Sequence, residues 1–175
     1  MAEIAIRTTV PADVPALAAL YPAAFPAEAL WPLVSALLED AVAPLSLAAF
    51  QGGRLAGHAV FTPCGIEGCR DQVSLLGPLA VTPASQRQGI GRALVQAGLP
   101  RLATAGIGHV CVLGDPAYYS RLGFGAEHAI LPPYPLPAEW DGAWQGRATA
   151  VSATLPCQGR LIVPPPWRQA TLWAP

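Results

Sequence analysis

The chain has 175 residues, of which 53% are hydrophobic, and its formal net charge at pH 7 is −1. All 10 basic residues are arginines, which excludes a P-loop lysine, a Schiff-base lysine and a lysine general base. The arginines are scattered and no apolar run is long enough to span a bilayer, so neither nucleic-acid binding nor membrane insertion is expected. The first residues include Glu3 and no basic segment, so a cytoplasmic location without a signal peptide is predicted.

The first part of the chain alternates between strand and helix patterns. Residues 3–9 alternate apolar and polar side chains and predict a strand. Asp13 is placed to cap a helix over 14–24, and a second helix is predicted over 27–41. Residues 45–62 predict a hairpin that turns at a Gln-Gly-Gly-Arg sequence.

The middle of the chain indicates a strand–helix–strand unit. A mostly apolar strand is predicted over 72–82, and the glycine–proline pair at 77–78 within it predicts a bulge or a loss of pairing. A helix over about 89–105, a strand over 109–115 and a short helix over 116–122 follow. This order of elements indicates a mixed α/β fold.

Prolines and tryptophans dominate from Leu131 onward, and a strand-like pattern returns over 158–163. Too little chain follows this segment to build a second domain. Residues 131–175 are therefore assigned to a single domain that covers 1–175.

Neither the cysteines nor the histidines form a metal-binding pattern. Only Cys64 and Cys69 are close in sequence, and no histidine completes a zinc set with them. The cysteines, which include Cys111 and Cys157, are expected to be free and mostly buried thiols, with a Cys64–Cys69 disulfide as the alternative. The three histidines share no spacing, and His109 and His128 are interpreted as ordinary polar residues.

A strand, a glycine-rich turn and a helix start form the most informative local pattern. Gly89 and Gly91 lie where the third helix begins, although glycine lowers helix propensity. The first N–H groups of a helix have no intrahelical partner and favour an anion, and glycine lets a phosphate approach the backbone. Arg87 and Arg92 flank this turn.

Four interpretations of the turn compete. It can be a tight strand-to-helix turn without a ligand, whereas the missing lysine excludes a Walker P-loop. A Rossmann turn would need a glycine where Leu94 stands and an acidic residue about 20 positions further on. The next acidic residue is Asp115, which is placed instead to cap the helix over 116–122. The fourth interpretation is a pyrophosphate site for coenzyme A.

Two segments carry a family resemblance. LAVTPASQRQGIGRAL (79–94) resembles the acyl-CoA-binding motif Q/R-x-x-G-x-G/A of the GCN5-related N-acetyltransferase (GNAT) superfamily, with Gln86, Gly89 and Gly91 at its positions. YYSRLGF (118–124) resembles the second signature of that family, a tyrosine four residues before Gly-Phe. The stretches VLGDPAYYSRLGF, PLPAEW and GRLIVPPPW are most similar to its YhbS-type branch.

The resemblance implies a GNAT-like acyl-CoA acyltransferase fold with a mixed, mostly antiparallel central sheet flanked by helices. It implies acetyl-CoA as the acyl-donor substrate and requires no metal. A strand end would hold the acetyl carbonyl and the pantetheine arm, and the glycine turn would hold the pyrophosphate. The donor-binding residues expected from this resemblance are Leu79, Ala80, Val81, Gln86, Arg87, Gln88, Gly89, Ile90, Gly91 and Arg92.

By the same resemblance, Tyr119 is the candidate general acid that protonates the departing thiolate, and Tyr118 is expected to pack into the core. Many relatives carry an acidic residue just before the strand end, where this chain has the glycine–proline pair of 77–78. The base is therefore a water chain or a group from elsewhere. Glu28 is the first candidate, as base or acceptor-site residue, and His58 is the second.

These observations predict an acetyl-CoA-dependent N-acetyltransferase acting on a primary amine of a small molecule or a peptide. The alternative is a non-catalytic acyl-CoA-binding sensor or partner-binding module with the same fold. A dinucleotide-binding oxidoreductase is a more distant alternative. The resemblance also suggests a homodimer, because homodimers are common in the superfamily.

Overall fold

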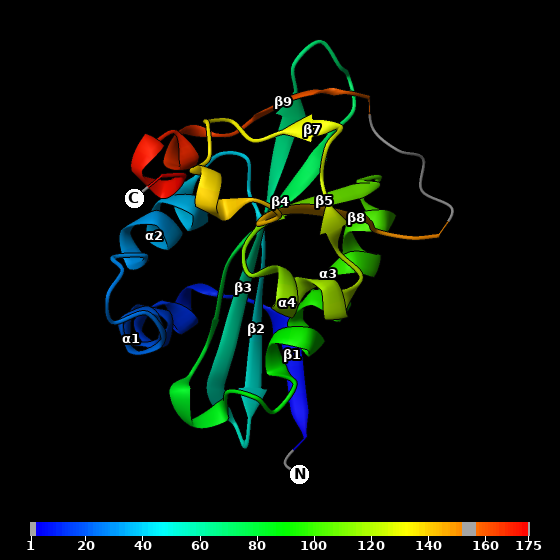
Figure 1. Ribbon diagram of the computed structural model, residues 1–175. Coiled ribbons are helices and arrows are strands. Elements are labelled where there is room, and N and C mark those ends of the chain that lie inside the picture. Colours follow the sequence, from blue (N-terminus) through cyan, green and yellow to red (C-terminus); the bar gives the residue numbers. More distant parts are fainter. Residues whose placement is uncertain (1–2, 152–156, 175) are drawn as a thin grey trace. The chain divides into compact units, whose positions relative to one another are not determined.

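The computed structural model describes residues 3–151 and 157–174 (Figure 1). The chain divides into two compact units, each built from two separate stretches. Unit 1 contains 1–61 and 77–98, and unit 2 contains 62–76 and 99–175. The assignment of 1–175 to one domain stays a prediction.

The helices and strands alternate along the chain in the order expected for a mixed α/β protein. The α-helices are α1 (Val14–Ala24), α2 (Trp31–Glu39), α3 (Ile90–Thr104) and α4 (Pro116–Tyr119). The strands are β1 (Ile4–Thr8), β2 (Leu45–Gln51), β3 (Arg54–Ile66), β4 (Val73–Val81), β5 (His109–Leu113), β6 (Gly125–Ala126), β7 (Ile130–Leu131), β8 (Trp144–Ala148) and β9 (Gly159–Ile162). Short 3₁₀ turns include η1 (Pro11–Asp13), η2 (Pro83–Ser85) and η3 (Ser120–Leu122).

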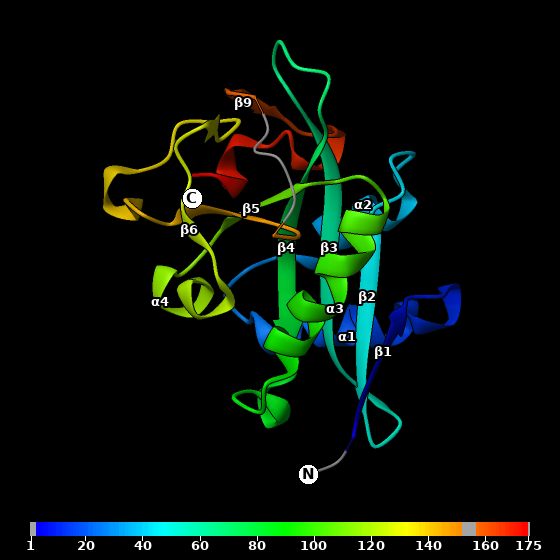
Figure 2. The same cartoon turned by 90° about the vertical axis from the view of Figure 1, so that its right-hand side faces the viewer.

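Unit 1 is built on an antiparallel meander. Strand β1 pairs with β2, and β2 pairs with β3 through the predicted hairpin, which closes at the Gln51–Arg54 pair. Helices α1 and α2 lie on one side of β2 and β3, and the start of α3 lies on the other (Figures 1 and 2). This arrangement follows from the alternation of side chains along β3, because Gly57 faces α3 and His58 faces α1.

Helix α1 spans the predicted residues 14–24, whereas its cap and the bounds of helix α2 differ from prediction. Helix α2 begins at Trp31 rather than residue 27, with Pro32 in its first turn, where a missing N–H is tolerated. Asp13 stands at the N-cap of α1, but its carboxylate does not cap that helix. It accepts two hydrogen bonds from Arg7 instead, at 2.7 and 2.8 Å, and a third from the Val10 N–H.

In unit 2 the first residues of β4 pair with β5 in parallel, and β8 pairs with β5 and β6 in antiparallel. The predicted C-terminal strand is confirmed as β9, which pairs with the end of β3 and with β7. Trp167 and Trp173 in the proline-rich tail are buried, so this tail forms part of the unit 2 core.

The pairing between β4 and β5 stops at Leu76↔Val112, immediately before the Gly77–Pro78 peptide, which is cis. The predicted loss of pairing at this position is therefore confirmed on the β5 side. Most of the ladders are antiparallel, as predicted, and none of the described helices is both long enough and apolar enough to cross a membrane.

Candidate active site

The glycine turn lies in unit 1 between the end of β4 and the start of α3. Arg87 and Gly89 both have left-handed backbone conformations, with φ of 60° and 83°. A side chain at Gly89 would meet no atom within 4 Å, so the turn is open at this point. Residues 86–89 are exposed, whereas Ile90 and Gly91 are buried at the helix start.

Side-chain amides hold the turn in place. Gln86 Nε2 donates to the Val81 carbonyl at 3.2 Å and so ties the turn to the end of β4. Gln88 Nε2 donates to the Ala84 carbonyl, and Gln88 Oε1 accepts from Gln51 at 3.0 Å. Gln51 also accepts from Ser85 Oγ at 3.1 Å. Sequence reasoning missed Gln51, because its link from the hairpin to the turn depends on tertiary structure.

Helix α3 sits close to β3 because Gly57 has no side chain. A Cβ at Gly57 would lie 2.8 Å from Ile90 Cγ2 and 3.1 Å from both the Ala80 carbonyl oxygen and Leu94 Cδ1. The close approach fixes the helix start and the β4 end against the same strand. The two segments that the sequence assigns to the donor are thus brought together within unit 1.

The turn has the chemistry of an anion site. The first N–H groups of α3 point away from the helix body, and the helix dipole adds a partial positive charge there. No acidic residue stands in the first turn of α3, and the exposed side chains of Arg87 and Arg92 add positive charge. A phosphate or pyrophosphate group fits this combination.

Tyr119, the candidate general acid, belongs to unit 2. Its ring is buried, lies over Gly114 and packs edge-on against Phe124 at a centroid distance of 5.5 Å. Tyr118 is 39% exposed, so the expectation that it packs into the core was wrong. The absence of a side chain at Gly114 makes room for Tyr119 instead. Burial, followed by the neighbouring Tyr118, raises the pKa of Tyr119 above its usual value, so the hydroxyl stays protonated.

The two candidate bases differ in their surroundings. Glu28 is exposed on the connection between α1 and α2. His58 is 0% exposed, and its ring nitrogens bond Tyr21 Oη at 2.6 Å and Ser46 Oγ at 2.7 Å. Burial lowers the pKa of His58 to about 4. The His58 ring is buried and neutral, and each of its nitrogens already has a hydrogen-bond partner, so its role is to hold the structure together. Its position does not support the suggestion that His58 is a base.

Unit 2 corrects two further expectations. Cys69 and Cys157 form a disulfide across 88 residues of sequence, while Cys64 and Cys111 are buried and free. His109 is buried rather than an ordinary end residue, and it pairs with Glu127. His128 is exposed, and Asp115 caps α4 as predicted, accepting from the Ala117 N–H at 2.9 Å.

The sequence model of the acetyltransferase (GNAT) family matches residues 14–124. The Escherichia coli K12 protein described as the uncharacterised N-acetyltransferase YhbS is 38% identical over 138 residues, which cover 78% of this chain and 80% of that protein. YjhQ from the same organism, described in the same words, is 38% identical over 131 residues, or 70% and 72% of the two chains.

Comparison with solved structures points to the same family. The crystal structure of E. coli YhbS in complex with CoA has a TM-score of 0.85 and 31% identity, covering 97% of this chain and 94% of that one. A GNAT family acetyltransferase from Brucella melitensis in complex with acetyl-CoA has a TM-score of 0.75 and 30% identity, covering 95% and 99%. The protein is therefore an enzyme of the acyltransferase class, an N-acetyltransferase. It belongs to the acetyltransferase (GNAT) family, and the predicted fold class is confirmed.

Proposed function

We propose that the protein transfers the acetyl group of acetyl-CoA to a primary amine of a small molecule or peptide by direct attack on the thioester. The observation that carries the proposal is the open glycine turn, in which Arg87 and Gly89 adopt left-handed conformations before the N-terminus of α3. Relatives of similar structure bind CoA and acetyl-CoA, which supports this donor.

The donor would lie along the end of β4 and over the turn. The backbone of Leu79, Ala80 and Val81 would bind the pantetheine arm and the thioester carbonyl, where an N–H stabilises the charge of the tetrahedral intermediate. The pyrophosphate would bind the N–H groups of 87–92, with Gln86 keeping the turn against Val81.

The chemical step needs two proton transfers. The free amine attacks the carbonyl carbon, a C–N bond forms and the C–S bond breaks. Tyr119, whose side chain is buried, would give its proton to the departing thiolate. Glu28, or water in its place, would take the proton that the amine loses. Glu28→Gln tests this assignment, because loss of the base should lower kcat and leave Kd for acetyl-CoA unchanged.

A hollow in unit 2 supports an amine with an apolar body as the acceptor. It measures about 490 Å³ and combines Trp140, Trp144 and two prolines with the carboxylate of Asp141. Aromatic faces and a carboxylate together suit an organic ammonium ion. Asp141→Asn would raise KM for such an amine with little change in KM for acetyl-CoA.

The test is release of the CoA thiol in mixtures of the protein, acetyl-CoA and a panel of primary amines. Thiol release that requires both the protein and one class of amine supports the proposal. Binding of acetyl-CoA without turnover across aromatic, aliphatic and peptide amines would favour the non-catalytic binding module instead.

A further inference from the structure

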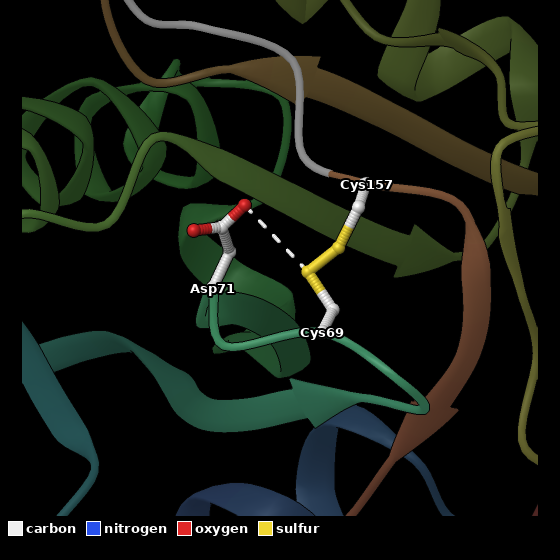
Figure 3. A group of neighbouring side chains, drawn as sticks. All are labelled: Cys69, Asp71 and Cys157. Atoms are coloured by element: carbon white, nitrogen blue, oxygen red, sulfur yellow. Dashed lines mark hydrogen bonds between the residues drawn. A yellow bond between two sulfur atoms is a disulfide. The ribbon is translucent and has the colours of Figure 1, made fainter.

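The Cys69–Cys157 disulfide joins two segments that the fold brings together from distant parts of unit 2. The two Cα atoms lie 6.3 Å apart, within the range that a disulfide spans. Cys69 stands in the connection between β3 and β4, and Cys157 stands two residues before β9 (Figure 3). The other two cysteines, Cys64 and Cys111, are buried and free.

Backbone contacts position the two cysteines independently of the bond between them. The last residues of β3 pair with β9 at Gly65↔Ile162 and Ile66↔Leu161, and the Glu67 N–H donates to the Arg160 carbonyl at 2.9 Å. A Cβ at Gly159 would lie 2.6 Å from the Glu67 carbonyl oxygen. The glycine thus permits the close approach that holds both sulfur atoms in reach, whatever their redox state.

Asp71 provides a partner for the reduced state. Its Oδ2 lies 3.6 Å from Cys69 Sγ, and the carboxylate points at that sulfur (Figure 3). A disulfide sulfur carries no hydrogen, so this contact becomes a hydrogen bond only when Cys69 is a thiol. The site therefore has a partner for Cys69 in each state, namely Cys157 when oxidised and Asp71 when reduced.

We propose that Cys69 and Cys157 form a reversible redox site that exchanges with low-molecular-weight thiols and disulfides, and that Asp71 directs the exchange through Cys157. The negative charge of Asp71 opposes the thiolate form of Cys69, and the thiolate is the nucleophile. The Cys157 thiolate therefore reacts first. This site is independent of the acetyl-transfer chemistry.

Oxidation by a disulfide RSSR proceeds in two displacements. The Cys157 thiolate attacks one sulfur of RSSR, forming a mixed disulfide and releasing RS⁻. The Cys69 thiol, which is hydrogen-bonded to Asp71, then loses its proton to water. The resulting thiolate attacks Cys157 Sγ and releases the second RS⁻. In sum, two cysteine thiols and RSSR give the protein disulfide and two RSH, with two electrons passed to RSSR. Reduction by a thiol runs through the same mixed disulfide in reverse.

The first test compares single-cysteine variants of the site in their reaction with glutathione disulfide, followed by intact mass. Cys69→Ser, which leaves Cys157, is expected to form its adduct about fivefold or more faster than Cys157→Ser, which leaves Cys69 beside Asp71. Adding Asp71→Asn to Cys157→Ser should raise the Cys69 rate about threefold or more. Adding Glu67→Gln, which removes an exposed charge from the same connection, should leave that rate unchanged.

A second test uses the unsubstituted protein and does not depend on whether the variants fold. The protein is reduced with a neutral phosphine, alkylated briefly with iodoacetamide and mapped by peptide mass. Cys157 should be labelled before Cys69, and glutathione disulfide added to the reduced protein should restore the disulfide. Equal labelling of the two cysteines, no effect of Asp71→Asn, or failure to form the disulfide would each overturn the proposal.

Discussion

Glu127 Oε2 lies 2.6 Å from His109 Nε2, and both side chains are more than nine-tenths buried. The pair joins the start of β5 to the residues after β6. Glu127 Oε1 also accepts from the Ala129 and Ile130 N–H groups. Burial raises the pKa of Glu127, but the hydrogen bond from His109 and the two backbone donors outweigh it, so the pKa lies below its usual value.

Glu127→Ala should destabilise the protein by about 3–5 kcal/mol, because it leaves a buried histidine and two partly buried N–H groups without their partner. Gly146→Ala should be destabilising for a related reason, since its Cβ would collide with both members of the pair. Urea denaturation measures both effects. The exposed variant His128→Ala is the control, and equal unfolding free energies for Glu127→Ala and His128→Ala would contradict the role given to the pair.

His58 makes stability depend on pH. Its pKa is about 4 in the folded protein and 6.5 in an unfolded chain. Between these values the unfolded chain binds a proton that the folded protein does not, so stability falls as pH decreases from about 6.5 to about 4. The loss contributed by this one group is roughly 3 kcal/mol at most. This loss of stability is complete below the pKa that His58 has in the folded protein, and it is absent above the pKa that His58 has in the unfolded chain.

Urea denaturation of the wild type and His58→Gln at several pH values checks this contribution. The variant is less stable at neutral pH, because Tyr21 and Ser46 lose a buried partner. Its stability should nevertheless fall less steeply than that of the wild type between these two pKa values. Parallel curves for the two proteins would show that His58 carries no such linkage.

Local patterns predicted most elements up to residue 122 but none of the strands β6, β7 and β8, and long-range contacts account for what they missed. The hairpin at 51–54 and the strand–turn–helix at 81–90 follow from residue types a few positions apart. By contrast, the Cys69–Cys157 bond spans 88 residues. It depends on β9 pairing with β3, which no local signal specifies.

Single-residue differences in burial were equally hard to predict. Tyr118 and Tyr119 are adjacent and chemically alike, and the missing side chain of Gly114 decides which ring is buried. His58 offered no sign of its role because its partners, Tyr21 and Ser46, lie on two other elements. The residues of the candidate site came from family motifs, and their roles stay predictions.

Gly57→Ala should weaken acetyl-CoA binding without touching the donor. The added Cβ would press on Ile90 and on the Ala80 carbonyl, and so push the start of α3 away from the β4 end. A destabilisation of about 1–3 kcal/mol is expected from this overpacking, with an increase in Kd for acetyl-CoA. Gly65→Ala, where the nearest atom would lie at an ordinary 3.6 Å, is the matched control on the same strand. Unchanged affinity in Gly57→Ala would argue against the close packing as a determinant of the site.

Tyr119→Phe should lower kcat by about 100-fold or more, the usual contribution of a positioned general acid, and leave Kd for acetyl-CoA nearly unchanged. Because burial keeps the pKa of Tyr119 above its usual value, the wild-type rate should show no loss from Tyr119 ionisation up to about pH 9. Tyr118→Phe, at the exposed neighbour, should retain activity. A wild-type rate for Tyr119→Phe at every pH would remove Tyr119 from the mechanism.

The most direct test of the account is isothermal titration of acetyl-CoA into the wild type, Gly89→Glu and Gly106→Glu, with NADH as a control ligand. Gly89 and Gly106 share a left-handed φ and open surroundings, so the two substitutions impose similar backbone strain. The account predicts micromolar binding to the wild type and to Gly106→Glu, and binding weakened about tenfold or more in Gly89→Glu, where a negative charge faces the pyrophosphate. Equal affinity in both variants, or no binding by the folded wild type, would contradict the assignment of the glycine turn to coenzyme A.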